Sequence, residues 1–239
     1  MRVHVLTTKQ ALDPDRLAGK AVVVLDVLFA TTSIAAALAG GASDVVPAVD
    51  GDSARAAAAG MAPGSFVLAG EYGAVTLPGF DHPTPLALLA LPLRGRSLVY
   101  STTNGTVALR RAAPAGRVYA AALANGEAVA RRLAALHRDD SVLLVCSGSA
   151  DAFNLEDFLG AGHLVSHLAR SVPGAVLSDA ALAARLLADG TDALAALAAS
   201  RVGRMMRDRG LLAEVEWAAR KDHLDVVPTL RDGRLTAAA

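Results

Sequence analysis

The sequence predicts an α/β protein built as a three-layer α/β/α sandwich around a mostly parallel or mixed sheet. Short runs of β-branched residues alternate with longer stretches of alanine and leucine, as strands alternate with helices in this class. The chain has 239 residues, 53% of them hydrophobic, which is enough to bury a core without disulfides or a structural metal. No serine- or glycine-rich linker interrupts it, so we expect a single domain over residues 1–239.

The expected strands are short and mostly apolar, as strands buried on both faces of a sheet are. They lie at residues 3–6, 21–25, 44–49, 66–69, 97–100, 117–120 and 142–146. Four helices between them are candidates for the crossovers that parallel strands require, at residues 32–39, 53–59, 105–113 and 126–137.

The second half of the chain, from Asn154 onward, is expected to be nearly all helical. Helices are predicted at residues 155–171, 179–188, 192–199 and 211–220, with breaks at Pro173, Gly190 and Gly210. A short extended piece at 225–228 precedes a polar turn at Asp232 and Gly233. The C-terminal half is therefore a helical addition to the layered first half.

Charge and hydropathy exclude several classes of partner. The 23 basic residues balance 23 acidic ones, so no net field attracts a nucleic acid, and we expect no nucleic-acid partner. The strongest apolar run, residues 21–30, contains Asp26 and falls short of the roughly 20 residues that span a bilayer, so no membrane partner is expected. No signal peptide is visible, and the single Cys146 cannot form an internal disulfide, which favours a cytoplasmic location.

Acidic residues follow several of the expected strands. In open α/β sheets, ligands bind beyond the carboxyl ends of the strands. Asp26 and Glu71 come directly after strands, and Glu156 and Asp157 lie in the first turn of a predicted helix. These acids could instead be satisfied by backbone N–H groups at helix starts. Carboxylates that converge on one sheet edge would repel each other unless a hard cation such as Mg²⁺ lay between them.

The junction at residues 101–106 joins a strand to a helix with hydroxyls, an amide and a glycine. N–H groups at such a helix start suit a phosphate or sulfonate. Ordinary capping by Thr103 or Asn104 is the alternative, but one cap needs only one polar residue. We therefore favour an anion site, and the candidate substrate-binding residues are Thr31, Thr32, Thr102, Thr103, Asn104, Gly105, Thr106 and Ser147.

His163 and His167 lie four residues apart on a predicted helix and so share one of its faces, as paired metal ligands do. The sequence shows no third ligand nearby. Glu156 is seven residues before His163, roughly 10 Å along the helix axis, too far to share an ion. A structural role for the two histidines is therefore favoured.

Taken in order, the polar junctions resemble the 2-phosphosulfolactate phosphatase (ComB-like) family. The resemblance spans nearly the whole chain, and no single motif is as specific as the ordered set. The matching segments are Asp26-Val27-Leu28 with Ala30-Thr31-Thr32, Gly70-Glu71, Gly79-Phe80-Asp81, Thr102-Thr103-Asn104-Gly105-Thr106, Leu155-Glu156-Asp157 with Ala161-Gly162, Ser178-Asp179-Ala180, and Asp225-Val226-Val227-Pro228.

This resemblance implies a Mg²⁺-dependent cytoplasmic enzyme that hydrolyses the phosphate monoester of a small sulfonated hydroxy acid, and it makes a homodimer plausible. By position, the metal-site residues would be Asp26, Glu71, Asp81, Glu156 and Asp157, with Asp26, Glu71, Glu156 and Asp157 catalytic. Residues 102–106 would hold the substrate anion. Leu28 stands where a second aspartate would assist an aspartyl-phosphate route, so attack by water is favoured over that route.

The chain departs from the family pattern at three places. Phe29 and Tyr72 stand where the family usually carries arginines, and a stretch containing Pro83-Thr84-Pro85 replaces the usual Asn-Ser-Pro. Arginine binds phosphate and sulfonate bidentately, so its loss weakens anion binding. Two alternatives follow: a catalytically silent relative that binds a small ligand, or a phosphatase for an ester without the sulfonate. Arginines elsewhere could compensate, and the candidates are Arg94, Arg96, Arg201 and Arg204.

Overall fold

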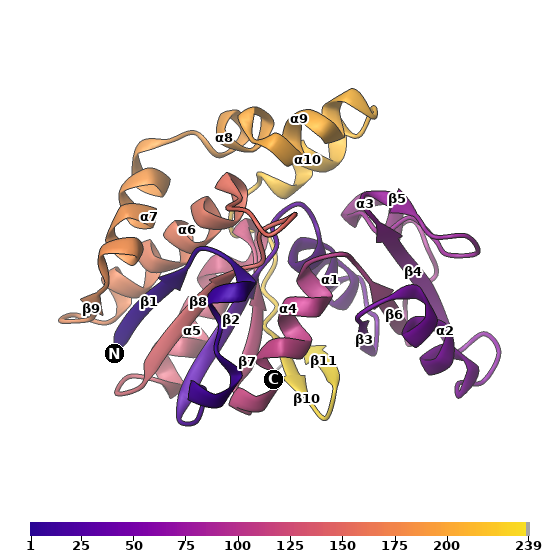
Figure 1. The fold of residues 1–239 in the computed structure, drawn as a ribbon, viewed down its shortest axis with the longest axis horizontal. Coiled ribbons are helices and arrows are strands. Elements are labelled where there is room, and N and C mark those ends of the chain that lie inside the picture. Colours follow the sequence, from indigo (N-terminus) through magenta and orange to yellow (C-terminus); the bar gives the residue numbers. More distant parts are fainter. Residues whose placement is uncertain (238–239) are drawn as a thin grey trace.

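The computed structural model describes residues 1–237 and confirms the predicted α/β class, with helices on both faces of one mixed sheet (Figure 1). The strand order across the sheet is β5-β4-β6-β3-β11-β10-β7-β2-β8-β1-β9. The strands are β1 (Arg2–Leu6), β2 (Lys20–Leu25), β3 (Asp44–Ala48), β4 (Phe66–Tyr72), β5 (Val75–Thr76), β6 (Ser97–Ser101), β7 (Val118–Ala121), β8 (Ser141–Cys146), β9 (Val176–Leu177), β10 (Pro228–Arg231) and β11 (Arg234–Ala237).

The α-helices are α1 (Ala30–Ala39), α2 (Gly51–Ala59), α3 (Pro85–Leu89), α4 (Gly105–Ala112), α5 (Gly126–Leu136), α6 (Leu155–Ser171), α7 (Asp179–Gly190), α8 (Ala193–Ala199), α9 (Arg201–Asp208) and α10 (Leu212–Ala218). From β2 to α6 the helices alternate with the strands along the chain, except that β5 directly follows β4. Among the described residues, no helix has the length and apolar character needed to cross a membrane.

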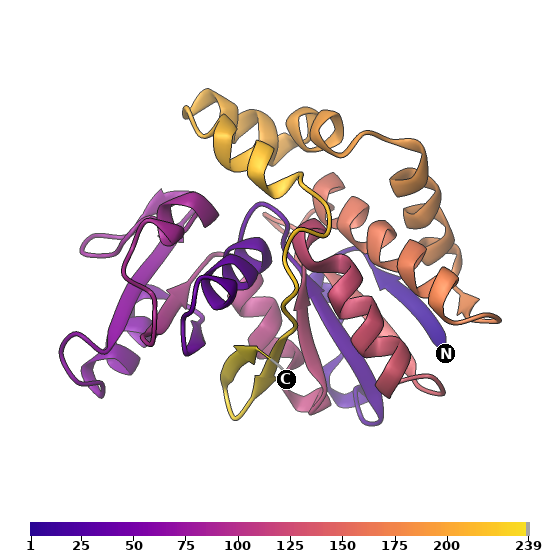
Figure 2. The same cartoon turned by 180° about the vertical axis from the view of Figure 1, so that it is seen from behind.

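Side chains alternate between the two faces of the sheet and so build two separate cores. Along β2, Val22 and Val24 pack in the core that contains α1 and α4, whereas Val23 and Leu25 pack in the core of α5, α6 and α7. On the outer strands, α2 packs against residues such as Val99 that face away from α1. Figure 2 shows α5 and α6 covering the strands that α4 covers from the other side.

The C-terminal hairpin joins two groups of parallel strands. β1, β2, β7, β8 and β9 run parallel to one another, β3, β4 and β6 form a second parallel group, and β10 and β11 pair antiparallel with β7 and β3. Asp232 and Gly233 connect β10 to β11, and their φ angles of 50° and 76° are the positive values that a tight hairpin turn needs. The sequence predicted this turn but not that the chain's last strands fill the middle of the sheet.

The last helices lie across one end of the sheet. Figure 1 shows α8, α9 and α10 above the region where β1, β2 and β4 end. The expected helices at 192–199 and 211–220 correspond to α8 and α10, but α3 and α9 were not predicted. Several residues of α9 are arginines, so its composition gives a weak signal for a packed helix. One side of α9 is nevertheless apolar, and its Val202 and Met206 are buried. Packing against the rest of the molecule therefore stabilises this helix, although its local composition does not predict one.

Candidate functional site

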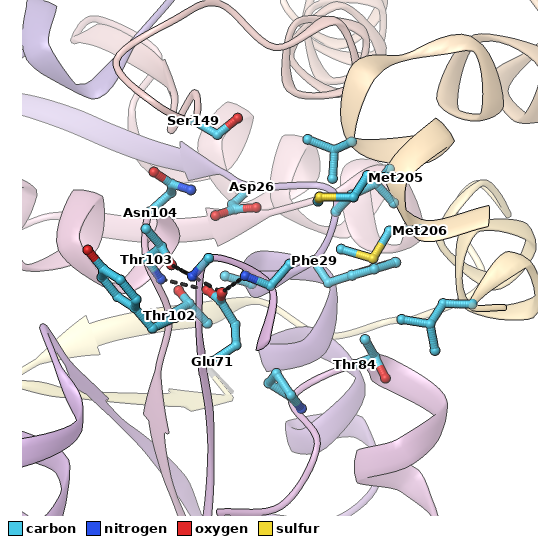
Figure 3. A pocket seen from close by; sticks show the side chains of 18 of the residues that line it. Asp26, Phe29, Glu71, Thr84, Thr102, Thr103, Asn104, Ser149, Met205 and Met206 are labelled. Carbon is cyan, nitrogen blue, oxygen red and sulfur yellow. Dashed lines mark hydrogen bonds between the residues drawn. The ribbon is translucent and has the colours of Figure 1, made fainter. Parts of the chain in front are cut away.

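A cavity of about 390 Å³ lies beneath α9, at the ends of β2, β4, β6 and β8. Residues that follow these strands form its polar side, and α9 and the segment before α10 form an apolar roof. Figure 3 shows the Asp26 carboxylate at the centre, with Asn104 and Glu71 on one side and the side chains of Met205 and Met206 on the other. The strand-end rule therefore predicted residues that the structure brings to one cavity.

Asp26 directly follows β2, and only 8% of its surface is exposed. Burial, then the neighbouring charges of Glu71 and Glu156, raises its pKa to about 7, although the Ala30 N–H and the charge of Lys9 oppose this shift. A carboxyl with such a pKa exchanges a proton near neutral pH, as a general base must.

Gly105, the first residue of α4, allows that helix to approach Asp26. A Cβ atom at this position would lie 2.7 Å from Asp26 Oδ2 and 2.4 Å from the Cβ of Ala30. Both distances are shorter than any stable non-bonded contact between such atoms. The glycine is therefore needed to bring the start of α4 against the carboxylate.

Glu71 lies near the end of β4 and joins two loops at the cavity. Its Oε1 accepts a hydrogen bond from the Thr103 N–H at 2.7 Å, and its Oε2 accepts from the Thr103 hydroxyl at 3.1 Å and from the Ala74 N–H at 2.5 Å. The Thr103 hydroxyl oxygen in turn accepts from the Gly73 N–H at 2.9 Å. Glu71 thus fixes the position of the loop that was predicted to bind an anion.

Glu156 and Asp157 lie in the first turn of α6, each 1% exposed. Asp157 Oδ1 accepts from the Val27 N–H at 2.9 Å and its Oδ2 from the Gly148 N–H at 3.0 Å, so both oxygens hold the loops after β2 and β8. Burial, Asp26 and Glu156 together raise the pKa of Asp157 well above its usual value. Asp157 therefore positions the loop that begins with Asp26, and its own side chain does not line the cavity.

Glu156 lacks such complete pairing. Within the described chain its Oε1 is buried and has no hydrogen-bond partner. Burial raises the pKa of Glu156, opposed by a hydrogen bond from the Ser200 hydroxyl and by the charge of Arg201. A buried carboxylate oxygen without a partner is costly, so this atom is a candidate ligand for a cation.

The loop at residues 102–106 satisfies most of its own polar groups. Thr102, Thr103 and Asn104 line the cavity, whereas Gly105 and Thr106 do not. The Thr102 N–H donates to Thr106 Oγ1 at 3.1 Å, and the Thr106 N–H donates to Thr102 Oγ1 at 3.2 Å. Across the described residues, the N–H groups of Asn104 and Gly105 are the ones in this loop that remain without a protein acceptor.

Glu156 also lies outside the cavity lining, as do four other predicted residues. The hydroxyls of Thr31 and Thr32 donate to the carbonyl oxygens of Asp26 and Val27 and so stabilise the turn into α1. The remaining two are Ser147, which is fully buried, and Asp81, which is exposed in a bridge with Ala69. The structure therefore does not bring Asp81 together with Asp26.

Lys9 was missed by the sequence reasoning. It is 8% exposed and its Nζ donates to Asn104 Oδ1 at 3.0 Å and to the Ser147 carbonyl oxygen at 3.2 Å. Its charge faces Asp26, whose pKa it lowers. The same strand-end rule would have found it, because Thr7, Thr8 and Lys9 directly follow the first strand.

Arg201 supplies the cavity with a cation from α9. Its Nη2 donates to Asn154 Oδ1 at 3.1 Å and to the Ser149 carbonyl oxygen at 3.2 Å. Phe29, which stands at one of the usual arginine positions, lies in the apolar part of the lining and is 7% exposed, and Tyr72 lies at the mouth and is 74% exposed. Of the four candidate compensating arginines, Arg201 is the one that lines this cavity among the described residues.

Asp26 and Glu71 are the predicted acids that line the cavity, and they offer oxygens of the kind that a hard divalent cation such as Mg²⁺ takes. Mg²⁺ commonly takes one or two carboxylates and keeps several waters, so the cavity carboxylates of Asp26 and Glu71 and the unpaired Oε1 of Glu156 offer suitable oxygens. Over the described residues, three of these acids do not already share one point within 4.8 Å. The phosphate of a substrate and water would complete such a coordination shell.

Comparison with known proteins identifies the family of this chain. The sequence model of the 2-phosphosulpholactate phosphatase family matches residues 6–233. A probable 2-phosphosulfolactate phosphatase of Symbiobacterium thermophilum is 38% identical over 224 residues, covering 92% of this chain and 95% of the relative. One of Carboxydothermus hydrogenoformans is 39% identical over 219 residues, covering 90% and 89%, and one of Clostridium beijerinckii is 27% identical over 238 residues, covering 99% of both. The chain therefore belongs to the 2-phosphosulfolactate phosphatase family.

Proposed function

We propose that this chain is a Mg²⁺-dependent phosphatase that removes the phosphate from 2-phosphosulfolactate. The observation that carries the proposal is the buried carboxylate of Asp26, which lines one cavity together with Glu71, Asn104 and Arg201. The relatives described above bear the name of this activity. Amide groups and a guanidinium at one cavity suit a small substrate that carries several anionic groups.

Asp26 and Glu71 would hold the Mg²⁺, with Oε1 of Glu156 as the third protein oxygen. When bound, Mg²⁺ supplies positive charge that offsets the negative charge on the phosphoryl oxygens. The buried acids themselves support such a cation, because Glu71 and Glu156 each raise the pKa of Asp26 by repulsion. Asp157 would act by positioning the loops after β2 and β8.

The chain's own groups would bind the substrate at both ends. The N–H groups of Asn104 and Gly105 are suited to the phosphate, and Arg201 is suited to the sulfonate. A water attacks the phosphorus and releases its proton to solvent, the P–O bond of the ester breaks, and the leaving oxygen takes a proton from solvent. The products are inorganic phosphate and the hydroxy acid, with no covalent enzyme intermediate.

Arg201 is the residue that tests the substrate assignment. Replacing Arg201 with Met should raise KM for 2-phosphosulfolactate about 10- to 100-fold, because a charge-assisted hydrogen bond contributes about 1.5 to 3 kcal/mol. The KM for 2-phospholactate, which lacks the sulfonate, should change little. Initial rates of phosphate release on both esters measure this difference.

Arg204 provides the matched control, since it lies on the same helix and outside the cavity lining of the described chain. Arg204→Met should leave both KM values near those of the unmodified enzyme. Equal losses on the two esters in Arg201→Met would contradict the assignment of Arg201 to the sulfonate.

A second candidate is a phosphatase for an ester with a larger apolar group. Phe29, Met205 and Met206 line the cavity, and Leu211 extends this apolar part of the lining. Preference for an aromatic or alkyl phosphate over 2-phosphosulfolactate in kcat/KM would favour this candidate. No phosphate release from any ester, together with thermal stabilisation by one of them, would indicate a silent binding protein instead.

We also propose that the enzyme is cytoplasmic and forms a homodimer. The free, buried thiol of Cys146 is compatible with a reducing compartment. Leu182 and Leu186, one turn apart on α7, are 46% and 66% exposed and offer an apolar face to a second copy. Cell fractionation and the mass in solution test the two properties separately.

A further inference from the structure

A second polar cluster, away from the cavity, joins α6 to the segment that follows α10. His163 Nε2 lies 3.0 Å from Asp222 Oδ1, and His167 Nε2 lies 3.0 Å from Asp222 Oδ2. The two imidazole rings meet edge to face with centroids 4.7 Å apart. The third ligand that the sequence did not reveal is thus brought in from 55 residues along the chain.

The donor atoms of this cluster are already close to a metal-binding arrangement. One atom from each of the three side chains lies within 4.8 Å of the others, and this is the one such group of three among the described residues. Zinc binds nitrogen and oxygen at about 2.0 to 2.2 Å, which places the donors of a tetrahedral site roughly 3.4 Å apart. The two 3.0 Å separations each join one imidazole to a different oxygen of Asp222, so the carboxylate lies between the two rings and an ion held there would replace these hydrogen bonds.

Neighbouring backbone groups hold the cluster in position. The Asp222 N–H donates to the Leu123 carbonyl oxygen at 2.9 Å, and Asp222 Oδ1 accepts from the Glu127 N–H at 2.8 Å. At Gly126 a Cβ atom would lie 2.6 Å from His163 Cδ2 and 3.4 Å from Asp222 Oδ1. The missing side chain therefore leaves the room in which His163 and Asp222 meet, and the hydrogen bonds orient the carboxylate as outer partners orient metal ligands.

Solvent can reach the cluster. The side chains of His163, His167 and Asp222 are 9%, 15% and 22% exposed, so water could complete the shell of an ion held there.

We propose that His163, His167 and Asp222 bind a zinc ion, at a site separate from the acidic cluster of the cavity. Two imidazoles and one carboxylate suit zinc better than magnesium, which prefers oxygen ligands. His163 is seven residues beyond Glu156, roughly 10 Å along α6, so the two sites do not share an ion. Zinc at this site would fasten the segment after α10 to α6 and to the start of α5.

Replacing Arg170 distinguishes a zinc site from a cluster that only stabilises the fold. Its Nη2 lies 3.2 Å from His167 Nδ1, where the guanidinium can only donate. This leaves the imidazole proton on Nε2, the atom that would bind the metal. Zinc binding moves that proton to Nδ1, so the exposed arginine must turn away. Arg170→Met removes this competition and one positive charge, and should therefore tighten zinc binding several-fold.

The experiment is equilibrium dialysis of the full chain against Zn²⁺ in excess Mg²⁺, with metal content and Kd measured. The unmodified chain and Asp26→Asn should each bind one zinc at this site, and His167→Gln and Asp222→Asn should weaken it about 100-fold or more. Co²⁺ in place of zinc should give the visible absorption of a tetrahedral site, lost in His167→Gln. If a variant fails to fold without metal, Arg170→Met and the cobalt spectrum of the unmodified chain decide. Absence of zinc binding, or zinc content unchanged in His167→Gln, would overturn the proposal.

Discussion

At the scale of single residues, Asp26 is the group on which the chemistry depends. Its carboxylate is buried, faces two other acids and has Lys9 as an opposing charge. Its pKa in the folded chain is about 7, compared with 3.8 for an ordinary aspartate. The metal-free protein therefore holds a proton on Asp26 that the unfolded chain releases at a much lower pH.

This difference makes the stability of the metal-free protein depend on pH. Between pH 3.8 and about 7 the folded chain binds the additional proton, so the stability falls as the pH rises through this window and then levels off. Asp26→Asn should reduce this dependence and raise the free energy of unfolding at pH 8 by a few kcal/mol, whereas Asp157 and Glu156, whose pKa values are also raised, keep their own contributions. Urea unfolding in EDTA at several pH values measures it, and parallel pH profiles for both proteins would refute it.

The sequence predicted Asp26, Glu71 and the loop at 102–104 because each follows a strand, and the structure brings them to one cavity. The position of a polar residue at a strand end does not predict which of its side-chain oxygens are already hydrogen-bonded to the protein. Asp157 and Thr31 are polar residues near the ends of strands, as a binding site requires, yet their side chains form hydrogen bonds to nearby backbone groups. Arg201 and Asp222 come from distant segments, so only the folded chain shows their contacts.

At the scale of elements, α10 is tied to the opposite side of the cavity by one carboxylate. Glu214, 6% exposed, accepts from the Thr84 hydroxyl at 2.6 Å and from the N–H groups of Leu86 and Ala87 at 2.8 and 3.2 Å. It thereby satisfies the first N–H groups of α3. The stretch containing Pro83 to Pro85, which departs from the family pattern, is part of this contact.

Removing that carboxylate should both destabilise the chain and loosen the roof of the cavity. Glu214→Ala leaves the α3 N–H groups unpaired, and we expect a loss of about 2 kcal/mol in the free energy of unfolding. Glu216→Ala, an exposed position on the same helix, should change it by less than about 0.5 kcal/mol. Chemical denaturation of the two variants compares them, and equal effects would show that the contact contributes nothing.

At the scale of the whole molecule, the last strands hold the two parallel groups of the sheet together. Leu230 and Leu235 of the hairpin are 6% and 0% exposed and pack in the same core as Val22 and Val45. Turn chemistry at Asp232 and Gly233 predicted the hairpin locally, but its place between β7 and β3 depends on contacts more than a hundred residues apart along the chain. Periodicity carries no information on such pairing.

Weakening the hairpin core should therefore destabilise the molecule as one unit. Leu235→Ala creates a cavity in a fully buried position, and we expect a loss of about 3 kcal/mol, whereas Leu136→Ala at a 54% exposed position should cost far less. Fluorescence of Trp217, the chain's single tryptophan, and far-ultraviolet circular dichroism should report the same transition. Two separate transitions in the unmodified protein would contradict this coupling.

The most direct test of the central claim is release of inorganic phosphate from 2-phosphosulfolactate as Mg²⁺ is varied, measured for the unmodified enzyme and for Asp26→Asn. We predict turnover that EDTA abolishes and added Mg²⁺ restores, and a fall in kcat of at least about 100-fold in Asp26→Asn with the fold retained. Turnover that EDTA does not affect, or that persists unchanged in Asp26→Asn, would contradict the account.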